Sequence, residues 1–230
     1  SSRKRHKSVF SIDRAEVFGR DFEIATIKDT FSKMQQLQNR SDQRCLVITG
    51  SDGVGKTAFV RRLVQTLTDS LSREMFAFCS GKFQNSQNAD NAPFSAITQA
   101  LSQHIQSKVI IPSERNIAVM KRYRSIFIKA VGRNGQLIVD LLPQLERAVG
   151  PQRHLPELPP SETRVRFWSC FSAFLEVIAN HRRKLVIFLD DVHFCDEDSM
   201  VMISRLLSNP NIFVILAMRN IKPDNPIYQP

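Results

Sequence analysis

The stretch that decides the fold is GSDGVGKT, from Gly50 to Thr57, which directly follows the apolar run CLVIT, from Cys45 to Thr49. It matches the pattern GxxxxGK[ST] at every fixed position and opens a helical pattern. Glycines let backbone N–H groups turn towards anionic oxygens, and the N-terminus of the following helix adds positive potential. The stretch therefore predicts a phosphate-binding loop between a strand and a helix.

The loop assigns chemistry to individual side chains. Lys56 is expected to reach the terminal phosphates of a nucleotide, and the Thr57 hydroxyl is expected to ligate Mg²⁺. We predict ATP as the nucleotide, and one reason is that no NKxD-type guanine-reading motif occurs in the chain. The predicted nucleotide-binding residues of the loop are Gly50, Ser51, Asp52, Gly53, Val54, Gly55, Lys56, Thr57 and Ala58.

A second acidic element completes this prediction. The apolar run Leu185 to Leu189 ends in Asp190 and Asp191. We expect Asp190 to orient Mg²⁺ through its water shell and Asp191 to polarise an attacking water as general base. An alternative is that Asp191 only caps a helix, since aspartate is also favoured there.

Arg219 follows the apolar run Ile212 to Met218, at the edge where a side chain could touch the γ-phosphate. Lys56, Asp191 and Arg219 are the predicted catalytic residues, although an ordinary solvated arginine remains an alternative for Arg219. We interpret His193, just after the acidic pair, as a structural or surface residue.

Four apolar, β-branched runs predict buried parallel strands. They are Cys45 to Thr49, Met75 to Cys79, Leu185 to Leu189 and Ile212 to Ala217. Helical patterns lie between them, at Asp21 to Leu37, Lys56 to Leu71, Pro93 to Ile105, and from Ser161, a predicted N-cap, to about His181. The alternation predicts a three-layer α/β/α P-loop NTPase fold with a central, mainly parallel sheet.

About a hundred residues separate the second and third motif-bearing strands, which is far more than one crossover needs. We predict a helical insert at about 84–183, interrupted at Gly132 to Gly135 and by an extended proline-rich connector at Gly150 to Pro160. The predicted organisation is a basic tail at 1–14, one domain at 15–222, and a C-terminal end or linker at 223–230.

The composition of the chain excludes several classes of protein. The 230 residues are 42% hydrophobic and 23% charged, as in an ordinary globular domain. No apolar run approaches the roughly 20 residues of a membrane span, and no signal peptide is evident, so we expect a cytoplasmic protein. Of the net charge of +10, four charges come from Arg3, Lys4, Arg5 and Lys7, and direct nucleic-acid binding is not favoured. The four scattered cysteines favour buried, reduced thiols.

Two further segments suggest a family. VFGRDFE, from Val17 to Glu23, resembles the GRxxE box of AAA-type and STAND ATPases, and LDDVHFCD, from Leu189 to Asp196, resembles their LDDxHWAD element. Phe194 and Cys195 depart from the usual Trp and Ala. Lys82-Phe83, Ala92 to Ala96, and Leu155 to Pro160 are similar to segments of the ATPase module of large multidomain signalling kinases and some cyclases.

The resemblance implies an ATP-dependent switch module attached to other signalling domains. It implies that Gly19 and Arg20 lie near the adenine or a hinge, that Arg219 is the sensor 1 residue, and that nucleotide-dependent self-association is an option. It also implies a helical lid, which we expect to be absent, because eleven residues follow Arg219.

Several functions stay open on the sequence. The leading hypothesis is a slow ATPase that acts as a regulatory switch. The alternatives are a non-hydrolysing nucleotide-binding scaffold, a DNA-associated AAA ATPase of the origin-recognition type, and a small-molecule or nucleoside kinase. A protein kinase is a poor fit, because the chain has no GxGxxG loop and no HRD-type segment.

Overall fold

The computed structural model describes residues 20–36, 44–70, 76–85, 93–109, 114–153, 155–156, 159–180 and 184–220. The predicted tail at 1–14, Gly19 and the predicted end or linker at 223–230 lie outside the described residues. The same holds for Leu37, Leu71 and Met75, each at one end of a predicted element.

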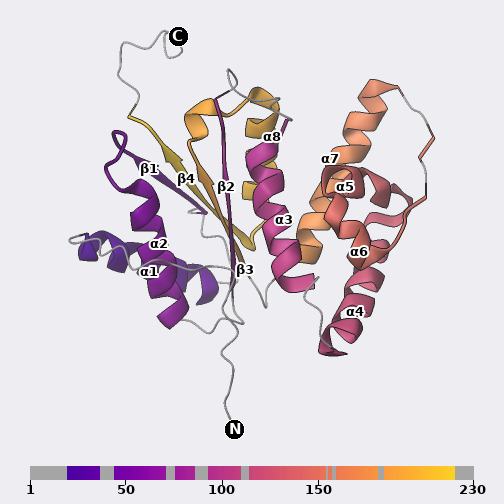
Figure 1. The fold of residues 1–230 in the computed structure, drawn as a ribbon, viewed down its shortest axis with the longest axis horizontal. Helices are drawn as coiled ribbons and strands as arrows, with labels where there is room; N and C mark the ends of the chain where they lie inside the picture. Colours follow the sequence, from indigo (N-terminus) through magenta and orange to yellow (C-terminus); the bar gives the residue numbers. More distant parts are fainter. Residues whose placement is uncertain are drawn as a thin grey trace.

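The described residues contain a four-stranded parallel sheet in the order β1-β4-β3-β2 (Figure 1). Its strands are β1 (Cys45–Thr49), β2 (Phe76–Lys82), β3 (Lys184–Asp190) and β4 (Ile212–Met218). The central strands β3 and β4 are buried along almost their whole length, which is why they read as continuous apolar runs. The predicted α/β fold class with a parallel sheet is confirmed.

Helices cover both faces of the sheet. On one side lie α1 (Asp21–Gln36) and α2 (Lys56–Ser70), and on the other lie α3 (Ser95–Val109) and α8 (Glu197–Ser208) (Figure 1). The α2 face buries Phe59, Leu63 and Leu67 against the sheet. This packing fixes the start of α2, and hence the phosphate-binding loop, at the carboxyl end of β1.

The part of the predicted insert that follows α3 forms a helical layer beside that helix (Figure 1). Its longest helices are α4 (Glu114–Val131) and α7 (Pro160–Ile178), and between them lie η2 (Gly132–Asn134), α5 (Gly135–Leu141), η3 (Pro143–Leu145) and α6 (Glu146–Val149). One continuous apolar cluster joins these helices to α3 and to the sheet. The layer is therefore packed onto the domain and is not a loose appendage.

The predicted interruptions of the insert are confirmed. Gly132 has a left-handed φ of +57°, which ends α4 without the penalty that a β-carbon would bring. Residues 150–153, 155–156 and 159 belong to no helix or strand, as expected for the connector.

Some local predictions were wrong. Pro159, not Ser161, is the N-cap of α7, and Pro160 opens the helix, because proline at the first position sacrifices no hydrogen bond. Pro93 lies in a turn before α3, not in its first turn. Cys45 is exposed because it lies at the start of an edge strand, whereas Cys79 and Cys170 are buried.

None of the helices in the described part of the chain combines the length and the apolar character that crossing a membrane requires.

Candidate nucleotide-binding site

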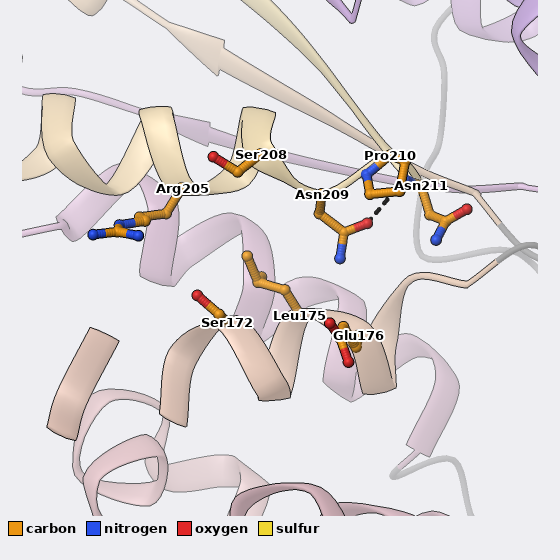
Figure 2. Close-up of a pocket in the computed structure, with 8 residues that line it drawn as sticks. All are labelled: Ser172, Leu175, Glu176, Arg205, Ser208, Asn209, Pro210 and Asn211. Carbon is orange, nitrogen blue, oxygen red and sulfur yellow. Dashed lines mark hydrogen bonds between the residues drawn. The ribbon is translucent and has the colours of Figure 1, made fainter. Parts of the chain in front are cut away.

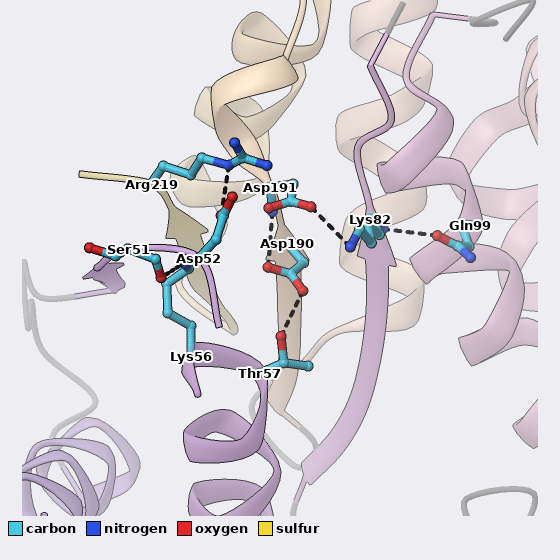
Figure 3. A network of polar contacts seen from close by, with 9 residues as sticks. All are labelled: Ser51, Asp52, Lys56, Thr57, Lys82, Gln99, Asp190, Asp191 and Arg219. Carbon is cyan, nitrogen blue, oxygen red and sulfur yellow. Dashed lines mark hydrogen bonds and ion pairs between the residues drawn. The ribbon is translucent and has the colours of Figure 1, made fainter. Parts of the chain in front are cut away.

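A cleft of 390 Å³ opens at the carboxyl ends of the strands, where parallel sheets bind their ligands. It is bordered by the loop between β1 and α2, by the end of β2, and by the residues that end β3 and follow β4 (Figure 3). Its lining residues are Asp52, Gly53, Gly55, Lys56, Thr57, Ala58, Lys82, Asp190, Asp191 and Arg219. Sequence and structure therefore place the predicted loop, acids and arginine in one cleft.

The loop has the backbone that a phosphate cradle needs. Gly53 and Gly55 have φ values of +74° and +91°, in the region that glycine adopts without strain. The Phe59 N–H donates to the Gly55 oxygen at 2.8 Å, so the first turn of α2 starts inside the loop. The Lys56 side chain is buried beneath it, and its Nζ donates to the Gly50 oxygen at 2.9 Å and to the Ser51 oxygen at 3.0 Å.

The Thr57 hydroxyl and Asp190 form the second part of the site. Thr57 Oγ1 donates to Asp190 Oδ2 at 2.9 Å, and the other carboxylate oxygen accepts from the Asp191 N–H at 3.0 Å (Figure 3). A hydroxyl that donates its proton to a carboxylate keeps its lone pairs for a cation. The described residues hold no group of three or more His, Cys, Asp and Glu side chains that could bind a metal ion, so the protein offers few ligands here. This donor set fits Mg²⁺, which keeps water and phosphate oxygens beside one or two protein ligands.

Asp191 ends the strand in an unusual conformation. Its φ of 53° and ψ of 43° are left-handed, which is uncommon for a residue other than glycine and occurs at sites where the backbone must turn a side chain sharply. Its Oδ2 lies 3.0 Å from Lys82 Nζ. The side chain of Asp191 makes no capping hydrogen bond to the short helix η4 (Val192–Phe194), so the alternative that it is merely a helix cap is not supported.

Arg219 is held at the rim of the same cleft. Its Nε lies 2.8 Å from Asp52 Oδ1, and its guanidinium carbon lies 5.8 Å from the ring centroid of Phe194. The side chain is 49% exposed but has defined partners, unlike an ordinary solvated arginine. Its contact with the loop agrees with the predicted position near a terminal phosphate.

Lys82 was not among the predicted site residues, although it belongs to the cleft. The hydrogen bond and charge of Asp191 raise the pKa of Lys82 above its ordinary value. The Lys82 backbone N–H donates to Gln99 Oε1 at 2.9 Å, which fastens the end of β2 to α3. The signal that could have revealed Lys82 is register: it lies opposite Asp190 in the parallel pairing of β2 with β3.

The structure does not bring Arg20 into the cleft. Arg20 precedes α1 with a φ of 65°, and its guanidinium carbon lies 5.8 Å from the ring centroid of Phe59. It is absent from the lining residues, so its role near the adenine stays a prediction. Gly19 lies outside the described residues.

His193 lies beside the acidic pair and packs against Phe194, with 4.1 Å between ring centroids. Neither ring nitrogen has a hydrogen-bond partner among the described residues. Burial lowers the pKa of His193. These properties agree with the structural role that we inferred from the sequence.

A second pocket, of 240 Å³, lies between α7 and α8 and reaches the turn before β4 (Figure 2). Arg205, Glu176 and Asn209 contribute polar groups to it. It lies at the amino end of β4, away from the phosphate-binding loop, and lacks a paired hydroxyl and carboxylate like Thr57 and Asp190. This pocket contains none of the residues that the sequence predicts to bind nucleotide or Mg²⁺.

Two solved structures resemble this fold at low sequence identity. Cdc6p from Pyrobaculum aerophilum is 15% identical, with a TM-score of 0.47, and the match covers 91% of this chain and 41% of that chain. PCH-2 from C. elegans is 8% identical, with a TM-score of 0.39, and the match covers 89% of this chain and 38% of that chain.

Comparisons of the sequence indicate the family more directly than the solved structures do. The chain is 28% identical over 195 residues to hybrid signal transduction histidine kinase G of Dictyostelium discoideum, a match that covers 84% of this chain but 5% of that protein. The chain therefore corresponds to a small part of this relative. Residues 16–215 match the family model described as AAA ATPase domain. Because this match spans most of the chain and includes the cleft, the chain belongs to the AAA ATPase domain family.

Proposed function

We propose that this domain binds Mg-ATP, hydrolyses it slowly, and passes its nucleotide state to attached signalling domains. The observation that carries the proposal is the convergence of Lys56, the Thr57–Asp190 pair and Asp191 in one cleft. Each of these groups has a distinct task in triphosphate chemistry.

Binding rests on the loop. Lys56 Nζ already points at two carbonyl oxygens of the loop, at hydrogen-bond distance. A phosphate oxygen is a stronger acceptor for the ammonium than a neutral carbonyl oxygen, because both partners then carry charge and attract each other. We therefore expect the ammonium to turn from the carbonyls to the phosphates. The N-terminus of α2 adds its positive potential at the same point.

Thr57 and Asp190 would hold Mg²⁺. A bound Mg²⁺ neutralises charge on the phosphates and orients them for attack by water. Asp190 is buried and accepts from both Thr57 and the Asp191 N–H, so its carboxylate is fixed before nucleotide arrives. Such preorganisation removes the cost of arranging the groups during the reaction.

Asp191 is the proposed general base. Its carboxylate lies in the cleft, one residue beyond Asp190, with Oδ2 3.0 Å from Lys82 Nζ. To accept a proton from water, the carboxylate must share or leave Lys82 Nζ. This requirement is one reason to expect slow turnover, which is sufficient for a switch.

The regulatory role is inferred from the relative, whose name describes a signalling histidine kinase. We propose a similar setting for this chain, in the cytoplasm and within a larger protein of the STAND type, with nucleotide-dependent self-association as an option. The non-hydrolysing scaffold is the alternative, and the ion pair that engages Asp191 favours it.

The first experiment is thermal unfolding with and without Mg-ATP. A ligand that binds only the folded state stabilises it by about 2.7 kcal/mol at a hundredfold excess over Kd. We expect a rise in Tm for the parent that Lys56→Ala abolishes, and an unchanged rise for the control Lys129→Ala, on an exposed face of α4. An equal rise in parent and Lys56→Ala would contradict the assigned site. Binding without phosphate release would leave the scaffold as the function.

A further inference from the structure

An ion pair bridges the phosphate-binding loop and the end of β4. Asp52 Oδ1 lies 2.8 Å from Arg219 Nε, and both side chains line the cleft (Figure 3). Both are partly open to solvent, at 61% exposure for Asp52 and 49% for Arg219. An incoming nucleotide can therefore reach the pair.

The negative charge of Asp52 opposes the positive electrostatic potential of its own loop. It is the one acidic residue between Gly50 and Ala58, in a loop whose glycines, lysine and helix N-terminus all favour an anion. A carboxylate at this position repels phosphate unless a cation offsets it. Lys56 does not serve this purpose, because its Nζ donates to the Gly50 and Ser51 oxygens, so Arg219 is the cation that Asp52 engages.

The guanidinium of Arg219 has N–H donors that Asp52 does not use. Its Nε pairs with Asp52 and its guanidinium carbon lies 5.8 Å from the Phe194 ring centroid, while its terminal nitrogens make no hydrogen bond within the described residues. A guanidinium carries five N–H donors in a planar fork that suits carboxylate and phosphate equally well. Arg219 can therefore exchange Asp52 for a phosphate oxygen without losing its packing on Phe194.

We propose that Asp52 competes with the terminal phosphate of a nucleoside triphosphate for Arg219, so that the Asp52–Arg219 pair is a latch that ATP opens and ADP leaves closed. The inference rests on the proposed function and deepens it, because it assigns the distinction between ATP and ADP to two residues. A switch needs such a distinction, because a ligand that binds two conformations with equal affinity does not shift the equilibrium between them.

The test is calorimetric titration with Mg-ATP and with Mg-ADP of four proteins: the parent, Asp52→Asn, Arg219→Gln and the double variant. An exposed ion pair contributes at most about 1 kcal/mol, so we expect Asp52→Asn to tighten ATP binding about two- to fivefold. The fold-change in ADP affinity should be less than about half of the fold-change in ATP affinity. In the Arg219→Gln background, Asp52→Asn should no longer favour ATP over ADP.

The control is Asp140→Asn, which removes the same charge from an exposed position on α5 and should alter neither affinity. Weaker ATP binding by Asp52→Asn would overturn the latch, because Asp52 would then position Arg219 for the phosphate. Equal tightening of ATP and ADP would overturn it in favour of plain charge repulsion. If the parent binds neither nucleotide more tightly than Lys56→Ala does, the proposed function itself fails, and the latch with it.

Discussion

The phosphate cleft and the helical insert are built on opposite physical principles. In the cleft, several charged side chains lie at the surface and are held by ion pairs, as for Lys82, Asp52 and Arg219. In the insert, aromatic rings such as Phe171 and Phe174 are fully buried against one another. Exposed ion pairs add little stability, whereas buried rings add much. Substitutions in the cleft should therefore change chemistry without changing stability, and substitutions in the insert should do the reverse.

The largest effect is expected from Asp191→Asn. Loss of a general base typically costs a hundredfold or more in rate, so phosphate release should fall by about that factor. Because Lys82 is 61% exposed, although Asp191 is 18% exposed, losing the ion pair should change the free energy of unfolding by about 1 kcal/mol. Phosphate release and urea unfolding measure the two effects. Hydrolysis equal to that of the parent would remove Asp191 from the role of base.

Phe171→Ala is expected to lower stability and to leave nucleotide binding unchanged, which is the opposite of the result for Asp191→Asn. Its ring is fully buried and lies 6.0 Å from the Phe167 ring centroid and 6.2 Å from that of Trp168. Deleting such a ring typically destabilises a protein by about 3–5 kcal/mol. The folded fraction should still bind Mg-ATP with the Kd of the parent, because no ring of this cluster lines the cleft.

The matched control for this deletion is Phe22→Ala. The Phe22 side chain is 82% exposed on α1, so its removal should cost almost nothing in the free energy of unfolding. A loss of nucleotide affinity in Phe171→Ala, measured at a temperature where the variant is folded, would show that the insert and the cleft are coupled.

A smaller effect tests the structure that joins the two regions. Asp196 caps α8: its Oδ1 accepts from the Ser199 N–H at 2.8 Å, and its Oδ2 accepts from the Ser199 hydroxyl at 2.7 Å. Ser199 Oγ in turn accepts from the Phe94 N–H at 3.2 Å. Asp196→Ala should therefore cost about 1–2 kcal/mol in the free energy of unfolding.

Asp198→Ala is the control, because Asp198 lies in the same first turn of α8 but only meets Arg164 at the surface, at 3.7 Å. Equal destabilisation by the two variants would indicate that charge near the helix N-terminus matters and that the capping bonds do not.

These comparisons explain which features the sequence could predict. The strands β3 and β4 are buried on both faces, so their apolar runs stand out, and the glycine spacing of the loop is tied to its backbone geometry. The contacts of Lys82 and Asp52 could not be predicted in the same way. They depend on which residues meet across strands and loops distant in sequence, and a single charged residue carries no periodic pattern.

The burial of Trp168 was harder to predict for a related reason. The spacing of the α7 aromatic residues predicts a core face, and Phe171 and Phe174 are indeed fully buried. Trp168 packs against this core but stays partly exposed, with Arg205 5.8 Å above its ring. A helical period identifies the apolar face of a helix, but it does not show how far the neighbouring elements cover that face.

The smallest expected effect concerns pH and His193. Burial lowers its pKa in the folded state below the ordinary value of 6.5, while in the unfolded chain that value holds. Between the two values the unfolded chain binds more protons, so stability rises with pH there. The contribution of neutral His193 to stability is therefore complete above about pH 6.5 and is lost as the pH falls through its folded-state pKa.

His193→Gln should flatten the rise of the urea midpoint between about pH 5 and 7, relative to the parent. Parallel curves for the two proteins would mean that His193 titrates alike in the folded and unfolded states.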